Sequence, residues 1–407
     1  MKLVSLSAVV NGKDEERAKK AVAAILENNS SLNRALLAQL DQATESLRSL
    51  DIFKNKFKKF ALVGIGGSSL GVQVFTQFFG NTQFTYFDNV DAAEFESQLT
   101  CLGDLKEVCW LFTSKSGETI ETLAVLEFVD QIYSEKKLNL NENSIIITEK
   151  KMSSLSQWAQ DRQIVQFEVP LAVGGRYSVL SHVGLVPAYL MGLDTQALAR
   201  GARQALENKA TLEKFVAASL SSFDRQEWIT VLWSYSSRLK NLGLWWQQLW
   251  AESLAKTVDL EGRPALRVST PLSLVGATDQ HSVLQQVAEG HKDKLVIFLR
   301  SDAAESGSII LKKSRIKATQ VLQGRRLGDL LQAEAVATQK SLTEVGVSNM
   351  TLSVGSFNEE TLAELIMFLQ ISVLALGHAH HINPQNQPGV ERGKILCKQL
   401  LAEQKHD

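Results

Sequence analysis

The feature that most constrains the fold is a repeated alternation of short apolar runs with stretches of helical composition. The runs are rich in β-branched and aromatic side chains, as is typical of strands buried on both faces of a parallel sheet. They fall at residues 60–64, 84–87, 108–112, 145–148 and 165–169, and then at 228–232, 265–268, 294–298 and 350–354. This alternation predicts an α/β fold with helices on both faces of each parallel sheet.

The two groups of runs predict two domains. The chain has 407 residues, which is more than one hydrophobic core usually serves. We predict an N-terminal helical segment at residues 1–45, a first α/β domain at 46–200 and a second at 201–407, which ends in a C-terminal helical segment. Residues 14–50 have the composition of two helices.

Composition limits the partners of the chain. A formal net charge of −1 argues against nucleic acid as the main partner, because binding to a phosphate backbone needs a basic surplus. The three cysteines, Cys101, Cys109 and Cys397, lack metal-like spacing and are typical of reduced, buried thiols in the cytosol. The apolar stretch 362–376 contains Glu364 and Gln370 and predicts a buried helix rather than a membrane span. We therefore expect a cytoplasmic protein that binds neither nucleic acid nor a membrane.

A glycine-rich loop follows the first apolar run. Residues 63–71 read Val-Gly-Ile-Gly-Gly-Ser-Ser-Leu-Gly. Glycines allow close backbone approach to an anion, and the N–H groups that begin the next helix attract phosphate. A dinucleotide loop would need glycine where Ser69 stands, although Asp88 lies near the spacing of a ribose-binding acid. Phosphate binding and an ordinary strand-to-helix turn both remain open for this loop alone.

A second loop, residues 112–122, follows the run at 108–112. Within residues 113–119 it packs four hydroxyl side chains and Lys115 around a turn that opens a helix. Hydroxyl and N–H groups suit the oxygens of a phosphate, but Ser and Thr are also ordinary helix caps. Because ligands of open α/β sheets bind beyond the carboxyl ends of the strands, two such loops on neighbouring strands favour an anion site.

Four further stretches carry candidate side chains. Residues 174–178 place Arg176 after two glycines, as a fixed cation or as a surface arginine. Helical spacing at 247–256 puts Gln248, Glu252 and Lys256 on one face, where Glu252 is a base or the partner of Lys256 in an exposed ion pair.

The other two stretches carry a histidine and a lysine. His281 is a candidate proton shuttle with Asp279 as a local partner. A Pro-containing turn at 384–389 leads to a helix that carries Lys394. His378, His380 and His381 lack a nearby acidic ligand, so we expect no metal site there.

Taken together and in this order, the six stretches resemble the glucose-6-phosphate isomerase family. The most specific parts are residues 64–71, 174–178 and 387–394, and the stretches at 114–117 and 279–282 support them. The resemblance implies two sugar-isomerase (SIS) domains, each a three-layer αβα sandwich around a parallel sheet. It also implies an aldose–ketose isomerase that interconverts glucose 6-phosphate and fructose 6-phosphate without metal or cofactor. The family works as a homodimer whose active site lies at the subunit interface.

The resemblance also implies roles for individual residues. Glu252 matches the base that moves the proton between C2 and C1, and Arg176 matches the cation that stabilises the cis-enediolate. His281, from the partner chain, and Lys394 match the residues that assist ring opening. The expected substrate- and phosphate-binding residues are Gly66, Ser68, Ser114, Lys115, Ser116, Thr119, Gln248 and Gln387.

Two departures from the family pattern affect these expectations. Glu118 stands in the second loop where the family has a small hydroxyl residue, so we predict that its carboxylate points away from the phosphate. Gln385 and Asn386 replace Phe-Asp before Gln387. A non-catalytic SIS-domain regulator that binds sugar phosphates and a nucleotide-dependent oxidoreductase remain the alternatives.

Overall fold

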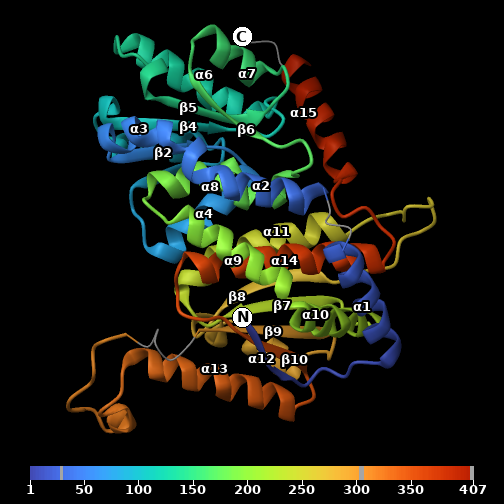
Figure 1. Ribbon diagram of the computed structural model, residues 1–407. Coiled ribbons are helices and arrows are strands. Elements are labelled where there is room, and N and C mark those ends of the chain that lie inside the picture. Colours follow the sequence, from blue (N-terminus) through green and yellow to red (C-terminus); the bar gives the residue numbers. More distant parts are fainter. Residues whose placement is uncertain (28–30, 302–306, 404–407) are drawn as a thin grey trace.

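The computed structural model describes residues 1–27, 31–301 and 307–403. Within them the chain forms two five-stranded sheets with helices on both faces, and a thick layer of helices lies between the sheets (Figure 1). The predicted α/β class is therefore confirmed.

The first sheet is parallel throughout and has the strand order β3-β2-β4-β5-β6. All of its strands coincide with predicted runs: β2 (Lys59–Val63), β3 (Phe84–Phe87), β4 (Val108–Thr113), β5 (Ser144–Glu149) and β6 (Val165–Val169). The helices that follow the first four are α4 (Leu70–Phe79), α5 (Ala92–Leu102), α6 (Ile120–Glu135) and α7 (Ser154–Asp161). Since β2 lies between β3 and β4 and the strands are parallel, the loops after β2 and β4 lie side by side at the carboxyl ends of the strands.

The second sheet has the order β1-β10-β9-β7-β8. Its parallel strands are β7 (Ile229–Ser234), β8 (Thr270–Val275), β9 (Lys294–Arg300) and β10 (Ser348–Ser353). The edge strand β1 (Lys2–Leu6) runs antiparallel to β10. The N-terminal residues that were expected to belong to a helical segment thus begin with a strand of the second sheet.

The prediction of a strand at residues 265–268 is wrong. Those residues are irregular, and the strand is β8, which begins at Thr270 and contains Pro271. Proline cannot donate a hydrogen bond to a neighbouring strand, so a run that contains it does not look like a buried strand. Because β8 is the edge of the sheet and pairs with β7 alone, Pro271 is tolerated there.

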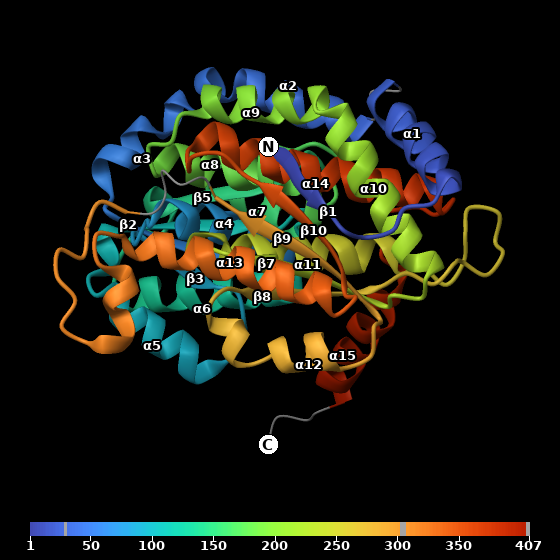
Figure 2. The same cartoon turned by 90° about the horizontal axis from the view of Figure 1, so that it is seen from below.

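Helices from both halves of the chain fill the space between the sheets, as Figures 1 and 2 show. They include α1 (Gly12–Glu27), α2 (Ser31–Ser46), α8 (His182–Leu190), α9 (Thr195–Glu207), α10 (Lys209–Asp224), α11 (Lys240–Leu254) and α14 (Glu359–Ala379). The largest apolar cluster joins Leu62 of the first sheet, Ile297 of the second and Ile366 of α14. The helical layer therefore forms one core with both sheets, and the domain boundaries at residues 45 and 200 stay a prediction.

The remaining helices lie outside this layer. α3 (Asp51–Lys56) is short and precedes β2, whereas α12 (Leu284–Glu289) and α13 (Leu327–Glu344) lie beyond the second sheet (Figure 2). α15 (Glu391–Glu403) ends the described chain and has no buried residue. Cys397 of α15 and Cys101 are exposed, so the expectation of buried thiols is confirmed for Cys109 alone. α14 is long and apolar enough by composition to cross a membrane, but 89% of its most apolar window is buried inside the protein.

His380 follows α14 and is a buried histidine without a hydrogen bond from either ring nitrogen within the described chain. Its ring packs against Phe223 at 5.4 Å between centroids. The pKa of His380 is lowered to about 4, mainly by burial and also by the charge of Arg17, while Asp14 opposes the shift. His381 lies instead at the surface and pairs with Glu261 at 3.1 Å.

We predict that His380 makes the protein acid-sensitive. Between pH 6.5 and pH 4 the unfolded chain binds a proton at His380 that the folded chain does not bind. The free energy of unfolding is therefore unaffected by His380 above pH 6.5 and decreases as the pH falls from 6.5 towards 4. Urea unfolding should show a loss of roughly 2 kcal/mol from this group between pH 7 and pH 5. His380→Leu should remove this part of the decline, whereas His381→Gln should keep it. An unchanged pH dependence in His380→Leu would contradict the assignment.

Candidate active site

The glycine-rich loop and the Arg176 stretch are in direct backbone contact. A Cβ atom on Gly67 would lie 2.3 Å from the carbonyl carbon and oxygen of Gly175, so only glycine fits at position 67. Ser178 donates a hydrogen bond to the carbonyl oxygen of Gly67 at 3.3 Å. The two stretches, far apart in sequence, therefore form one surface beyond the end of β2.

Arg176 is the side chain of the site with the most hydrogen bonds, and only 2% of the residue is exposed. Nε donates to Ser253 at 2.7 Å, and Nη1 donates to Glu252 at 3.1 Å and to Gln387 at 2.9 Å. Nη2 donates to the carbonyl oxygens of Pro384 at 2.6 Å and Asn386 at 3.1 Å. A buried guanidinium must be paired in this way, because an unpaired buried charge is very costly.

Glu252 lies on α11 and joins Arg176 to Gln248. One carboxylate oxygen accepts from Arg176, and the other accepts from Gln248 Nε2 at 3.0 Å. The carboxylate side chain is 31% exposed, so it stays accessible while both of its oxygens are oriented. The predicted one-face spacing of Gln248 and Glu252 is thus realised on a helix whose tryptophans, Trp245, Trp246 and Trp250, are buried.

Lys256 does not form the ion pair with the Glu252 carboxylate that helical spacing suggested. α11 ends at Leu254, and the Lys256 ammonium instead donates to the carbonyl oxygens of Glu252 and Ser253. The pKa of Lys256 is lowered to about 8, mainly by burial and also by the charge of Arg176, while Glu252 opposes the shift. Lys256 therefore closes the last turn of the helix that carries Glu252.

The second loop lies beside the glycine-rich loop, since β2 and β4 are neighbours. Ser114 is buried and shares a hydrogen bond with Thr119 at 2.8 Å, and its Oγ accepts from the N–H of Gly117 at 3.1 Å. Lys115 pairs with Glu149 at 3.0 Å. In the described structure neither α4 nor α6 has a side-chain cap at its N-terminus, which leaves N–H groups of both helices available to an anion.

Glu118 does not contact Lys115 in the described structure. Its carboxylate accepts hydrogen bonds from the N–H and the hydroxyl of Ser154, at the start of α7, at 2.7 and 2.8 Å. These two bonds lower the pKa of Glu118. The departure at position 118 thus connects the loop to α7.

The other acidic candidate, Asp88, is bonded through one oxygen. Its Oδ2 accepts from Ser69 at 3.2 Å and from Gln73 at 2.5 Å. These bonds join the end of β3 to the glycine-rich loop and to α4. The serine at position 69, where a dinucleotide loop needs glycine, stays the argument against the dinucleotide alternative.

His281 and Lys394 make no direct contact with the Arg176–Glu252 pair within the described residues of the single chain. His281 is exposed, and Asp279 accepts from the N–H of Val275 and from Ser282 rather than from His281, so the expected local partnership is wrong. Lys394 is 63% exposed on α15 and pairs with Glu391 at 2.8 Å.

Sequence reasoning missed three groups that shape the site. Ser253 and the main-chain carbonyl of Pro384 bind Arg176, and Glu149 pairs with Lys115. A main-chain acceptor leaves no signal in residue types. Ser253 adjoins Glu252 but faces the buried side of α11, and Glu149 is visible only as an acid at the end of an apolar run.

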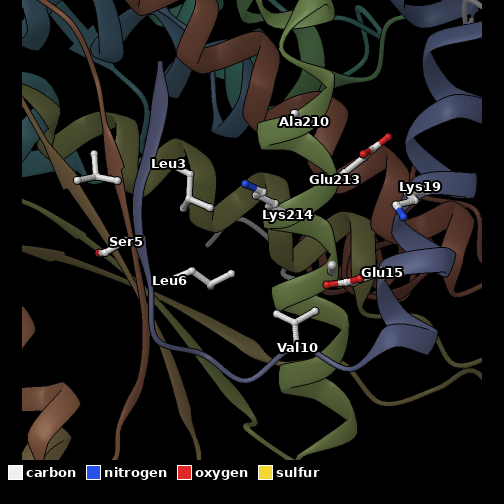
Figure 3. Close-up of a pocket in the computed structure, with 11 residues that line it drawn as sticks. Leu3, Ser5, Leu6, Val10, Glu15, Lys19, Ala210, Glu213 and Lys214 are labelled. Atoms are coloured by element: carbon white, nitrogen blue, oxygen red, sulfur yellow. The ribbon is translucent and has the colours of Figure 1, made fainter.

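A separate groove of about 460 Å³ lies between β1 and α10. Figure 3 shows Leu3 and Leu6 of β1 facing Ala210 and Lys214 of α10 across it. Its lining contains none of the predicted site residues.

Comparison with known proteins gives a consistent result. A family model described as phosphoglucose isomerase matches residues 8–407. The glucose-6-phosphate isomerase of Rubrobacter xylanophilus is 34% identical, over 83% of this chain and 81% of its own length. A glucose-6-phosphate isomerase of Thermus thermophilus is 33% identical, over 89% of each chain.

Solved structures show the same architecture. A hypothetical protein from Thermus thermophilus has a TM-score of 0.85 and 30% identity, over 96% of this chain and 95% of that one. A glucose-6-phosphate isomerase from Chlamydia trachomatis has a TM-score of 0.77 and 22% identity, over 91% of this chain and 74% of that one, which is a likeness of fold.

We predict that Gly67→Ala disrupts the site by separating its two backbone segments. The new Cβ atom would meet the carbonyl of Gly175, and overpacking of this kind typically costs about 1–3 kcal/mol. Gly175→Ala is the matched control, since a Cβ atom there meets nothing within 4 Å. Thermal unfolding should show a lower midpoint for Gly67→Ala alone. Equal midpoints for the two variants would count against the close contact.

Proposed function

The chain belongs to the phosphoglucose isomerase family, and we propose on that basis that it interconverts glucose 6-phosphate and fructose 6-phosphate in glycolysis and gluconeogenesis. The observation that carries the proposal is an accessible carboxylate, Glu252, oriented by a buried cation, Arg176, and by Gln248. Two loops suited to phosphate lie at neighbouring strand ends beside this group. A base with an adjacent cation is the arrangement that proton abstraction next to a carbonyl requires.

Glu252 acts as the base in the proposed mechanism. It removes the proton from C2 of the open-chain aldose, the C2–H electron pair forms the C1–C2 double bond, and the carbonyl oxygen at C1 becomes an oxyanion. Arg176 stabilises the resulting cis-enediolate. The hydroxyl proton on O2 passes to O1, which moves the negative charge to O2. Glu252 then returns its proton to C1 as the carbonyl forms at C2, and this gives the ketose. Because Arg176 is already fixed by five hydrogen bonds, it needs little reorganisation as the charge develops.

The phosphate end of the substrate is assigned to the two loops. We propose that Gly66, Ser68, Ser114, Lys115, Ser116 and Thr119 bind the phosphate or the adjoining sugar atoms. Gln248 and Gln387 are assigned to the sugar, since both amides already lie against the Arg176–Glu252 pair. Binding energy from a phosphate that does not react can be used to orient the carbons that do.

His281 and Lys394 are assigned to ring opening, and this assignment requires a second chain. Both side chains are exposed in the single chain. α15 also exposes Ile395, Leu396, Leu400 and Leu401, an apolar set that a partner would cover. We therefore propose a homodimer with the active site at the subunit interface and His281 supplied by the partner. A cytoplasmic location, where sugar phosphates are metabolised, is part of the same proposal.

The decisive experiment converts fructose 6-phosphate to glucose 6-phosphate and detects the product with a coupled dehydrogenase. Glu252→Gln keeps the shape of the base but cannot accept the proton, so turnover should fall by about 10²–10⁴-fold. Binding of inorganic phosphate, measured by calorimetry, should change little. If Glu252→Gln retained wild-type turnover, Glu252 would not be the base. Phosphate binding without any wild-type turnover would instead favour the non-catalytic regulator.

A second prediction concerns the assignment of Lys394. Lys394→Met should lower turnover of fructose 6-phosphate, whose ring must open before isomerisation, by about ten- to a thousandfold. Lys398→Met is the matched control, because Lys398 is also an exposed lysine of α15 but is not among the assigned residues. Equal turnover in the two variants would contradict the role of Lys394.

A further inference from the structure

Glu149 is a buried carboxylate that lies between two lysines at the carboxyl end of β5. Its side chain is 6% exposed, with one oxygen 3.0 Å from Lys115 Nζ and the other 2.9 Å from Lys151 Nζ. Lys115 is the cation of the second loop, and no step of the proposed reaction uses Glu149. Its position beside Lys115 gives it a direct effect on the lysine assigned to the phosphate.

The main chain of Lys115 is held from the same place. The N–H of Glu149 donates to the carbonyl oxygen of Lys115 at 3.1 Å, and the hydroxyl of Thr148 donates to it at 3.3 Å. Two successive residues of β5 thus fix both the carbonyl and the ammonium of Lys115. The direction of the lysine side chain is set before any ligand binds.

The remainder of the second loop also contacts the segment that follows β5. The N–H of Leu155 donates to the carbonyl oxygen of Gly117 at 3.1 Å. A Cβ atom on Gly117 would lie 2.0 Å from the hydroxyl of Ser153, so the loop fits closely against the start of α7. Glu118 adds its two hydrogen bonds to Ser154. Glu149 is therefore one point of a continuous support for the loop.

Stability alone is a weak reason for this arrangement. A buried ion pair often contributes little net stability, because removing the charges from water offsets their attraction. A free lysine, however, has several rotatable bonds whose entropy is lost when a ligand fixes the side chain. A lysine that is already fixed loses less on binding. With Lys151 as a second cation, the group as a whole stays positive toward a phosphate.

We propose that Glu149 is a positioning residue that holds Lys115 for the phosphate of the substrate. This inference rests on the proposed function, which assigns Lys115 to that phosphate. It makes a prediction opposite in sign to that of simple electrostatics. If Glu149 only added a negative charge near the phosphate, its removal would strengthen phosphate binding. If it holds Lys115, its removal weakens binding.

The test is a double-mutant cycle of wild type, Glu149→Gln, Lys115→Met and the double variant. Calorimetry gives the dissociation constant of inorganic phosphate, and the coupled assay gives KM and kcat with fructose 6-phosphate. Glu149→Gln should raise the dissociation constant and KM about tenfold, equivalent to about 1.4 kcal/mol, and change kcat less than about threefold. In the Lys115→Met background the same change should have less than about a twofold effect.

Two results would overturn the proposal. An equal effect of Glu149→Gln in both backgrounds would mean that Glu149 acts on the fold rather than through Lys115. Unchanged or tighter phosphate binding would mean that it does not position the lysine. Glu118→Gln is the matched control for charge, because it removes a nearby carboxylate that does not contact Lys115. It should change the dissociation constant less than Glu149→Gln does.

Separate measurements distinguish a failure of folding or of catalysis from a failure of the proposal for Glu149. Thermal unfolding of each variant checks that the chain is folded. Should Glu149→Gln not fold, Glu149→Asp keeps the charge but shortens the side chain, and the same cycle should show a smaller rise in the dissociation constant. If the wild type binds phosphate but has no isomerase activity, the proposed function fails while the calorimetric cycle still tests Glu149. A wild type that binds no phosphate would overturn the proposal for Glu149.

Discussion

The candidate site depends on the hydrogen bonds that pair the buried guanidinium of Arg176. Its partners come from two parts of the chain: Ser253 and Glu252 on α11, and the stretch 384–387, which supplies the Gln387 side chain and the main chain at Pro384 and Asn386. Because a buried charge cannot be left without partners, these segments must converge wherever Arg176 lies. The close backbone contact of Gly67 with Gly175 then brings the glycine-rich loop to the same point. One paired cation thus holds Glu252, the glycine-rich loop and the C-terminal segment together.

Much of the fold follows from periodicity, because a strand buried on both faces must be apolar throughout. All five strands of the first sheet coincide with predicted runs, as do β7, β9 and β10. The exceptions lie at the edges of the second sheet, where one side of a strand has no partner. Pro271 makes β8 look unlike a strand, and β1 is a short run near a region of helical composition. A strand lies at an edge because no strand pairs with one of its sides. That depends on the arrangement of the whole sheet and cannot be recognised from the residues of the strand itself.

For the candidate site, the sequence could indicate which residue types come together, but it could not indicate which atoms contact one another. Gln248 and Glu252 share a helix face, and both loops lie at neighbouring strand ends, as spacing and topology indicated. Around Gln385 and Asn386, which replace Phe-Asp, Arg176 binds the main-chain carbonyls of Pro384 and Asn386 rather than a side chain. Main-chain acceptors are the same for every residue type. His281 and Lys394 are exposed in the single chain, and the proposed homodimer would bring them to the site.

The two ends of the proposed substrate site share one electrostatic design. At the reacting end Arg176 is paired with Glu252, and at the phosphate end Lys115 is paired with Glu149. In each pair the cation is held by a carboxylate of the protein, so it does not have to be ordered by the ligand. The carboxylates differ in burial: Glu252 has a side chain 31% exposed, whereas that of Glu149 is 6% exposed. An accessible carboxylate can exchange a proton with a substrate, and an enclosed one can act only on its neighbours. Under the proposed function, the same pairing of charges would therefore serve chemistry at one end of the site and orientation at the other.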